Sequence, residues 1–203
     1  MAFFVGCGFY HIVNLSKYQK DFALIGKRIK TDVQAVIDLQ EYLDGTNSEQ
    51  NKLFQSDKLN AKLEEYRAAY QRTKSTSFAA PFVDITDFFN GEFLDELGHT
   101  GFCELVPGTM TGLGILGTFV GLVLGVGGFD TSTTDAVMVS ITHLLGGMST
   151  AFLTSIVGVL LSLLFSHFYK MYHDSADESL EDFVTAFHDN NLDGSSNNAE
   201  NQL

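Results

Sequence analysis

The chain has 203 residues, 45% of them hydrophobic, and its 25 acidic and 12 basic residues give a formal net charge of −13. This acidic balance argues against a nucleic-acid binder, because phosphate contacts need clustered Lys and Arg. Eleven of the twelve basic residues lie between Lys17 and Lys74, and segment 107–169 contains none. The two cysteines, Cys7 and Cys103, each lie in or beside an apolar stretch, a pattern that indicates neither a disulfide framework nor a metal site.

Residues 2–15 form an apolar run that is too short to span a bilayer alone. The run is either a re-entrant or interfacial piece or, as we favour, the inner half of a first membrane helix whose outer half is missing from this chain. The basic residues that follow, from Lys17 to Lys30, favour a cytoplasmic exit by the positive-inside rule.

Segment 16–105 has the composition of a cytoplasmic helical loop. Thr31 is expected to cap a helix that ends at Gly45 and has an apolar side made of Val33, Val36, Ile37 and Leu43. A second helix is predicted from the helical spacing of Leu59, Leu63, Tyr66 and Tyr70.

The rest of this loop is predicted to hold a linker and a short helix. Residues 74–82 contain Pro81 and are typical of a linker. Residues 84–97 favour a short helix with Phe88, Phe89, Phe93 and Leu94 on its apolar side. No stretch has the pattern of a strand.

Segment 106–129, VPGTMTGLGILGTFVGLVLGVGGF, carries no charge and eight glycines. As a helix it is long enough to cross a hydrocarbon core of about 30 Å. Each glycine would cost a soluble helix roughly 1 kcal/mol, whereas in lipid glycines let neighbouring helices approach closely. Gly117, Gly121 and Gly125 repeat every four residues, and Gly108 and Gly112 form another such pair, so the segment predicts a closely packed membrane helix.

A second apolar region, 136–169, contains no Asp, Glu, Lys or Arg and exceeds the length of one span. Gly146 and Gly147 favour a break, which places the membrane core at 147–166 and an outer extension at 135–145. The connector 130–135 has two acids and no base, so we expect it outside and the long loop and C-terminus inside.

The tail is expected to hold a separate amphipathic helix followed by a disordered end. Its apolar residues fall at i, i+3, i+4 and i+7 and predict packing against the other cytoplasmic helices: Leu180, Phe183, Val184 and Phe187. Residues 190–203, rich in Asn and Ser, are typical of disorder.

Hydroxyl side chains recur along both apolar segments. Thr111 and Thr118 are two helical turns apart, and Ser155 and Ser162 share a face with Thr150 and Thr154 nearby. Spacing leaves two interpretations open: the hydroxyls bond back to carbonyls one turn earlier, or they line a path for water, an ion or a partner's carboxylate. Neither span core has an acid or base, so a carboxylate that carries protons must come from another chain.

Enzyme signatures are missing from the sequence. It has no phosphate-binding loop after a strand, no Cys/His metal spacing and no nucleophile elbow. We therefore expect no catalytic residue, no metal and no cofactor.

Two motifs carry a family resemblance. PGTMTGLGILGTFVGLVLG (107–125), followed after a short loop by GGMSTAFLTSIVGVLLS (146–162), resembles the MotA/TolQ/ExbB proton-channel family over residues 107–169. MTGLGILGTF and the preceding DFFNGEFLDEL look closest to the A subunit of Zorya-type anti-phage motors. At Thr150 the chain departs from TolQ and ExbB relatives, which carry a Glu in this span.

The resemblance implies a mechanism and a set of residues. Such subunits form a ring, commonly of five, around the single membrane helices of a B-type partner that carries an essential Asp. Thr118 matches the threonine of the second-span GT motif and Ser155 the hydroxyl of the third-span motif, so these two are expected to face that Asp. Further candidates for the ion path are Thr111, Thr150, Thr154 and Ser162.

We therefore predict an all-α integral membrane protein with two full transmembrane helices and a partial N-terminal one. Its regions are a partial first helix at 1–15, a cytoplasmic loop at 16–105, a channel domain at 106–170 with spans at about 106–128 and 147–166, and an acidic cytoplasmic tail at 171–203. The predicted function is a stator subunit in the bacterial inner membrane that couples an ion gradient, either H⁺ or Na⁺, to mechanical work. The Zorya resemblance implies that this work serves anti-phage defence. The alternative is a non-conducting or holin-like membrane scaffold.

Overall fold

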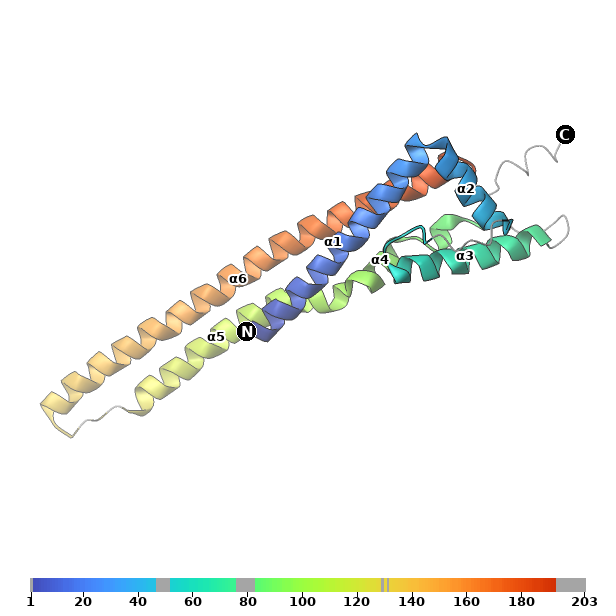
Figure 1. The fold of residues 1–203 in the computed structure, drawn as a ribbon. Coiled ribbons are helices and arrows are strands. Elements are labelled where there is room, and N and C mark those ends of the chain that lie inside the picture. The colour runs from blue at the N-terminus through green and yellow to red at the C-terminus, as the bar shows by residue number, and fades with distance from the viewer. Residues whose placement is uncertain (1, 47–51, 76–82, 129, 131, 193–203) are drawn as a thin grey trace. The chain divides into compact units, whose positions relative to one another are not determined.

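A computed structural model describes residues 2–46, 52–75, 83–128, 130 and 132–192, with side chains from Gly6 onward. The secondary structure of these residues is helical, as predicted (Figure 1). The elements are α1 (Ala2–Thr31), α2 (Val33–Asp44), α3 (Asp57–Ser75), the 3₁₀ helix η1 (Ile85–Asp87), α4 (Gly91–Gly98), α5 (Thr100–Gly127) and α6 (Thr134–Asp189). Most of the predicted linker 74–82 and of the predicted disordered end 190–203 lies outside the described residues.

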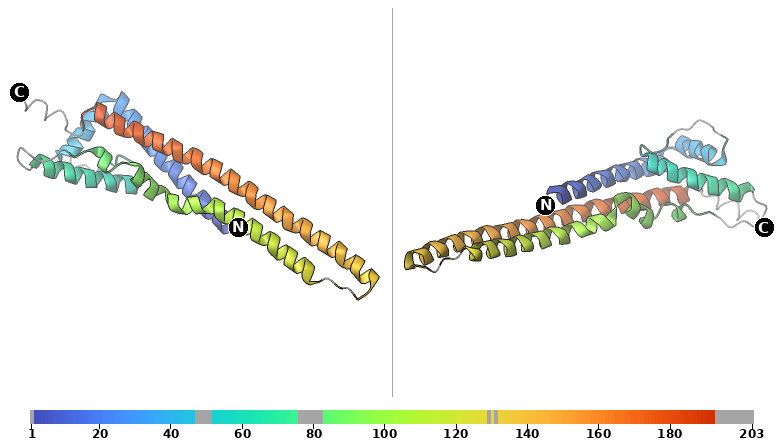
Figure 2. Two further views of the ribbon diagram at one scale, coloured as in Figure 1. Left: turned by 180° about the vertical axis from the view of Figure 1, so that it is seen from behind. Right: turned by 90° about the horizontal axis from the view of Figure 1, so that it is seen from below.

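The chain divides into two compact units, to both of which α1 and α6 contribute. The first unit comprises residues 1–11 and 99–171, and the second comprises residues 12–98 and 172–203. In the first unit α5 and α6 lie side by side and antiparallel (Figure 1, Figure 2). Gly8 of α1 lies beneath the ring of Phe165, whose Cε2 would be 2.5 Å from a Cβ added at Gly8.

Two helical segments among the described residues are long and apolar enough to cross a membrane, namely α6 and the segment that ends in α5. Their most apolar 18-residue windows have mean hydropathies of 2.1 and 1.8, yet only 22% and 11% of these windows is buried inside the chain. A core helix of a soluble protein would be mostly covered by its own chain, so these faces need lipid or other subunits to cover them. This is the surface of a membrane protein.

The predicted break at Gly146 and Gly147 is wrong, because α6 runs as one helix from Thr134 to Asp189. Glycine lowers helix propensity by roughly 1 kcal/mol but does not prevent helical geometry. Here Gly147 packs against α5, where a Cβ would lie 3.8 Å from Gly125 Cα. Gly147 therefore lies in the contact with α5 within a continuous helix, and an added Cβ would make only ordinary van der Waals contact there.

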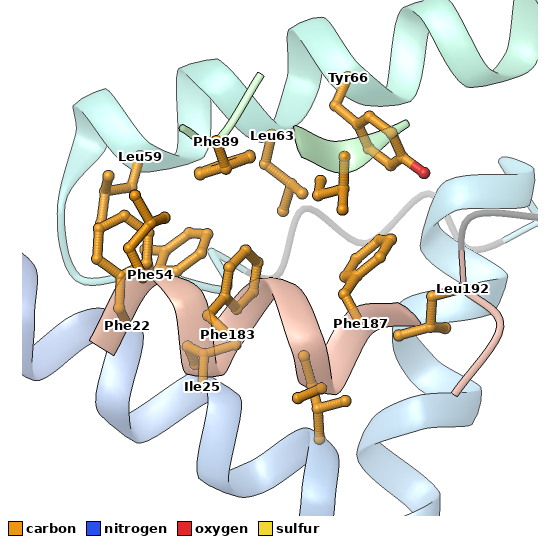
Figure 3. Packing of buried hydrophobic residues seen from close by; sticks show 14 of the residues in the cluster. Phe22, Ile25, Phe54, Leu59, Leu63, Tyr66, Phe89, Phe183, Phe187 and Leu192 are labelled. Carbon is orange, nitrogen blue, oxygen red and sulfur yellow. The ribbon is translucent and has the colours of Figure 1, made fainter. Parts of the chain in front are cut away.

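The helix predicted in the tail is the end of α6 and not a separate element. Its predicted apolar face is correct: Leu180, Phe183 and Phe187 are buried, and Val184 packs against the same core. Phe183 is at the centre of an aromatic cluster (Figure 3), with ring centroids 5.7 Å from Phe22, 5.6 Å from Phe54 and 5.4 Å from Phe89.

Helix α3 supplies the opposite wall of this core with the residues expected from its sequence. The side chains buried along one face of α3 are Leu59, Leu63, Tyr66 and Tyr70. The predicted helix over 84–97 is split, because Asn90 accepts a hydrogen bond from the Phe93 N–H (3.0 Å) and so begins α4 after η1. Phe89, between the two, is buried against Phe22 and Phe54.

Helix α2 begins differently from the expectation. Thr31 is the last residue of α1, where its hydroxyl donates to the Lys27 carbonyl (2.8 Å). The cap is Asp32, whose carboxylate accepts from the Gln34 N–H (3.0 Å). The expected end at Gly45 is confirmed, since Gly45 adopts the left-handed conformation with φ of 77°.

The predicted apolar side of α2 is only partly correct. Leu43 is buried and Val36 packs against the core, but Val33 and Ile37 are exposed. Leu39, which the sequence reading left out, is buried in their place. The apolar face of this short helix is narrow, so only Leu39 and Leu43 are buried against the core.

A polar clamp ties the turn before α3 to α1. Asp21 of α1 is only 4% exposed, and its Oδ2 accepts from the Ser56 N–H (2.9 Å). The Asn60 side chain accepts from the Phe54 N–H (3.0 Å) and donates to the carbonyls of Phe54 and Ser56. Because the backbone N–H and C=O groups of the turn have these hydrogen-bond partners, the turn can hold the Phe54 ring in the aromatic cluster.

We expect Phe183→Ala to lower the free energy of unfolding of the second unit by about 3–5 kcal/mol, because a fully buried ring would leave a cavity among three other rings. The matched control is Leu24→Ala in α1, where the side chain is half exposed and the loss should be several times smaller. Denaturant titration in detergent, followed by circular dichroism at 222 nm, measures both. Equal losses for the two variants would contradict the central place of Phe183 in the core.

Candidate functional site

The contact between α5 and α6 is a seam of small residues, here called the glycine seam: Gly114, Gly117, Gly121 and Gly125 of α5. A Cβ added at Gly121 would lie 2.7 Å from Ala151 Cβ, closer than real Cβ atoms approach. At Gly114 the added Cβ would lie 3.3 Å from both Cα and the carbonyl oxygen of Ser155. The two helix backbones therefore approach each other more closely than they could if side chains stood between them.

Thr118 links the two helices across this seam. Its Oγ1 lies 3.1 Å from the carbonyl oxygen of Ala151 in α6 and 3.2 Å from that of Gly114 in its own helix. The Ala151 carbonyl also accepts from Thr154 Oγ1 (2.7 Å), and Ala151 is 3% exposed. In an apolar medium a hydrogen bond between helices resists separation, because the parted groups would find few partners in lipid.

One side of the seam is hollowed into a groove of about 640 Å³. Its α5 wall is mostly glycine, and its polar groups come from His143, Thr150 and Thr154 of α6. A neighbouring hollow of about 460 Å³ shares Gly117 and Thr154 and is otherwise lined mainly by aliphatic side chains. Of the two hollows, the one that also holds His143 and Thr150 lies nearer the α5–α6 connection.

The six hydroxyl residues named from the sequence do not lie along one surface. Thr150 and Thr154 line the groove. Thr118 and Ser155 lie in the seam, half buried, and Ser155 contacts Gly114 through its backbone. The remaining two, half-buried Thr111 and buried Ser162, line neither hollow.

The hydrogen bonds show the first of the two uses that spacing had left open for hydroxyls in lipid, bonding back to a carbonyl of the same helix, and they do not test the second. Thr150 donates to the Gly146 carbonyl (3.2 Å) and Thr154 to that of Ala151, so both bond back into their own helix. Thr118 bonds back to Gly114 and also reaches across to α6.

Sequence reasoning placed Gly117, Gly121 and Gly125 in a packing face, and all three lie against α6. It missed Gly114, which precedes Gly117 by one helical turn, and Ala151, the small residue opposite Gly121. It also missed His143 as part of the groove. Gly108 and Gly112, the other pair with the same spacing, have nothing within 4 Å of an added Cβ, so spacing alone does not identify the packed pair.

No Asp, Glu, Lys or Arg occurs in segments 107–128 and 136–169, so the seam offers hydroxyls, carbonyls and one imidazole but no fixed charge. Such a surface can hydrogen-bond water, a hydrated ion or a carboxylate from another chain. Without a carboxylate of its own it cannot bind and release a proton by the usual route of intramembrane acids.

A helical fold with two uncovered apolar helices joined along a glycine seam defines a helical membrane protein. Residues 3–197, nearly the whole chain, match the ZorA-like family, described as the anti-phage protein ZorA of the Zorya type I system, and the chain belongs to that family. The Zorya resemblance noted in the sequence is thereby confirmed.

Two relatives, each called Zorya protein ZorA, match parts of the chain. The protein of Escherichia coli strain Crooks is 48% identical over 68 residues, which are 34% of this chain and 12% of that relative. The protein of Escherichia coli O139:H28 is 33% identical over 124 residues, which are 61% of this chain and 16% of that relative. The chain thus matches only a small part of each relative's length.

We expect Gly121→Ala to lower stability and Gly112→Ala to leave it unchanged or raise it. Alanine favours the helix by roughly 1 kcal/mol at either position, but at Gly121 it would collide with Ala151 and cost about 1–3 kcal/mol in overpacking. Thermal unfolding in detergent should show a lowered midpoint for Gly121→Ala and an unchanged or raised one for Gly112→Ala. A Gly121→Ala protein as stable as the parent would refute the close approach.

Proposed function

We propose that the chain is an ion-conducting stator subunit that couples an ion gradient, most simply a proton gradient, to mechanical work in anti-phage defence. The proposal rests on family membership and on one structural observation, the hydrogen bond from Thr118 to the Ala151 carbonyl within an uncharged membrane seam. Hydroxyls and carbonyls at such a seam can hydrate a path, while the absence of an acid there requires a carboxylate from outside the chain.

The partner in this proposal is a B-type subunit with one membrane helix that carries an Asp. Copies of the chain form a ring, of five subunits by resemblance to the MotA/TolQ/ExbB family, around the partner's helices in the bacterial inner membrane. The long loop and the C-terminus lie in the cytoplasm, as the distribution of Lys and Arg favours. The ring supplies the wall of the path and the partner supplies the group that binds and releases the ion.

Within this wall Thr118 and Ser155 face the partner's carboxylate, and Thr150 and Thr154 line the groove beside them. The Thr118 hydroxyl has two carbonyl acceptors within 3.2 Å, from Gly114 and Ala151. A hydroxyl that can exchange between acceptors can turn toward an arriving carboxylate or water with little change in the two helices. The same turn would release the Ala151 carbonyl, which keeps its bond from Thr154.

A second candidate function is a non-conducting membrane scaffold. It is favoured by the fact that the hydroxyls of Thr118, Thr150 and Thr154 each donate to a carbonyl of the chain itself. In a scaffold these bonds would only secure packing, and their loss would change stability but no ion flow.

Proton uptake into liposomes, reported by a pH-sensitive dye, separates the two functions when the protein is reconstituted with and without its partner. We expect uptake only with the partner, and a fall of about tenfold or more in Thr118→Val, which keeps the shape but removes the hydroxyl. The matched control is Thr109→Val, because the exposed Thr109 only bonds back to the Leu105 carbonyl of the same helix. Uptake that needs no partner and is the same in both variants would reject the stator function.

A further inference from the structure

Helix α1 carries a row of cations that have no carboxylate partner in the described residues. Lys17, Lys20, Lys27 and Arg28 are all exposed, and none forms an ion pair there. Five cations outside this row have a carboxylate within 4.0 Å: Lys30, Lys52, Lys62, Arg67 and Lys74. Exposed Lys58 of α3 forms no ion pair among the described residues. Four exposed cations thus lie on one helix of a chain that has 25 acids, and among the described residues none of the four has a carboxylate partner.

These four residues form a single stripe, here called the basic stripe, on the side of α1 that faces away from the core. Positions 17, 20, 27 and 28 fall within one face of a helix with 3.6 residues per turn. The buried side chains Phe22, Ile25 and Ile29 lie on the opposite face. The stripe is thus available to another molecule rather than to the chain's own core.

The end of α6 carries the complementary surface. Asp177, Glu178 and Glu181 are exposed, form no ion pair among the described residues and face away from buried Phe183; they are called the acidic stripe. Asp182, at its edge, pairs with Lys30 (2.8 Å).

The two stripes lie at the same level within the second unit, where α1 and the end of α6 run side by side in the same general direction (Figure 1, Figure 2). A Cβ added at Gly26 would be 3.2 Å from Phe183 Cα, which fixes the register of the two helices. Lys20 precedes Gly26 by six residues and Asp177 precedes Phe183 by six, so both lie about 9 Å along their helices from that contact.

We propose that the basic stripe of one copy docks against the acidic stripe of the next copy. If the copies are related by rotation about an axis roughly parallel to these helices, each residue stays at the same height along that axis in every copy. The basic stripe of one copy can then meet the acidic stripe of the next at the same height. Because the two stripes are on different faces of the chain, this is a head-to-tail contact that can close into a ring. This interface rests on the ring of the proposed function and adds to it the surfaces that join neighbours outside the apolar segments. Complementary charge also favours the correct neighbour and opposes contact between like stripes.

Site-specific cross-linking tests the contact in the full chain, in a background where Cys7 and Cys103 are replaced by Ala. One tagged chain carries Lys20→Cys, and a second, differently tagged and co-expressed chain carries Asp177→Cys. Under mild oxidation we expect a disulfide-linked heterodimer from this pair and none from the control pair Lys58→Cys and Glu92→Cys, two exposed residues outside the stripes. No heterodimer from the stripe pair, in a preparation that assembles into rings, would overturn the proposal.

Charge exchange supplies the second test and separates the possible occupants. Lys17→Glu with Lys20→Glu, or Asp177→Lys with Glu181→Lys, should weaken assembly by roughly tenfold in concentration, more at low salt than at high salt, and the two sets combined should restore it. Mass photometry in detergent measures the assembled fraction. Loss without restoration would overturn a second copy as the occupant and would point to anionic lipid instead.

These readouts do not involve ion flow, so the two proposals can fail separately. Intact proton uptake without the cross-link overturns the interface alone. A cross-linked ring that takes up no protons with its partner overturns the stator function alone.

Discussion

The approach of α5 to α6 at Gly121 and Ala151 is the contact on which the membrane part of this protein depends. Lipid offers two apolar helices no hydrophobic gain from associating, so their contact must come from close packing and hydrogen bonds. The glycine seam provides the packing, and the Thr118 hydroxyl on the Ala151 carbonyl provides the bond. A residue as small as alanine at position 121 would already collide with the opposite helix.

The second unit is stabilised by the opposite means. Its core is built from large rings on several helices: Phe183 of α6 meets Phe22 of α1 and Phe89 beside α4. Phe187 of α6 meets Phe183 and Tyr66 of α3. The hydrophobic effect drives the burial of these rings, whereas it does not favour the contact of two apolar helices at the glycine seam. One helix, α6, therefore contains small residues where it meets α5 and aromatic residues where it enters this core, and its composition changes along its length accordingly.

The sequence allowed the helical class, the two apolar helices and the buried faces of α3 and of the end of α6 to be predicted, because each depends on periodicity along one helix. Other features depended on contacts across the chain and were missed. Gly146 and Gly147 were interpreted as a break, although Gly147 is a packing residue whose role depends on Gly125 in the other helix. Thr31 and Asp32 are both acceptable caps by residue type, and only the end of α1 decides between them.

The hydroxyl residues illustrate the same limit. Helical spacing places Thr150, Thr154 and Ser155 close together but does not say on which side of the seam each one lies. That depends on the rotation of α6 against α5, which the Gly121–Ala151 contact sets. Residue type and spacing were thus sufficient to predict the glycine seam but not to assign each hydroxyl residue to one side of it.

The buried carboxylate of Asp21 gives the second unit a built-in reporter. The Ser56 amide that it holds belongs to no helix, so a solvent-exposed turn would exchange its hydrogen with water almost freely. Held by a side chain from a helix 35 positions earlier, that amide is protected from exchange while Asp21 stays in contact with the turn before α3. Its exchange rate therefore reports on this contact between α1 and the turn before α3 through a single backbone position, in the resting protein and without denaturant.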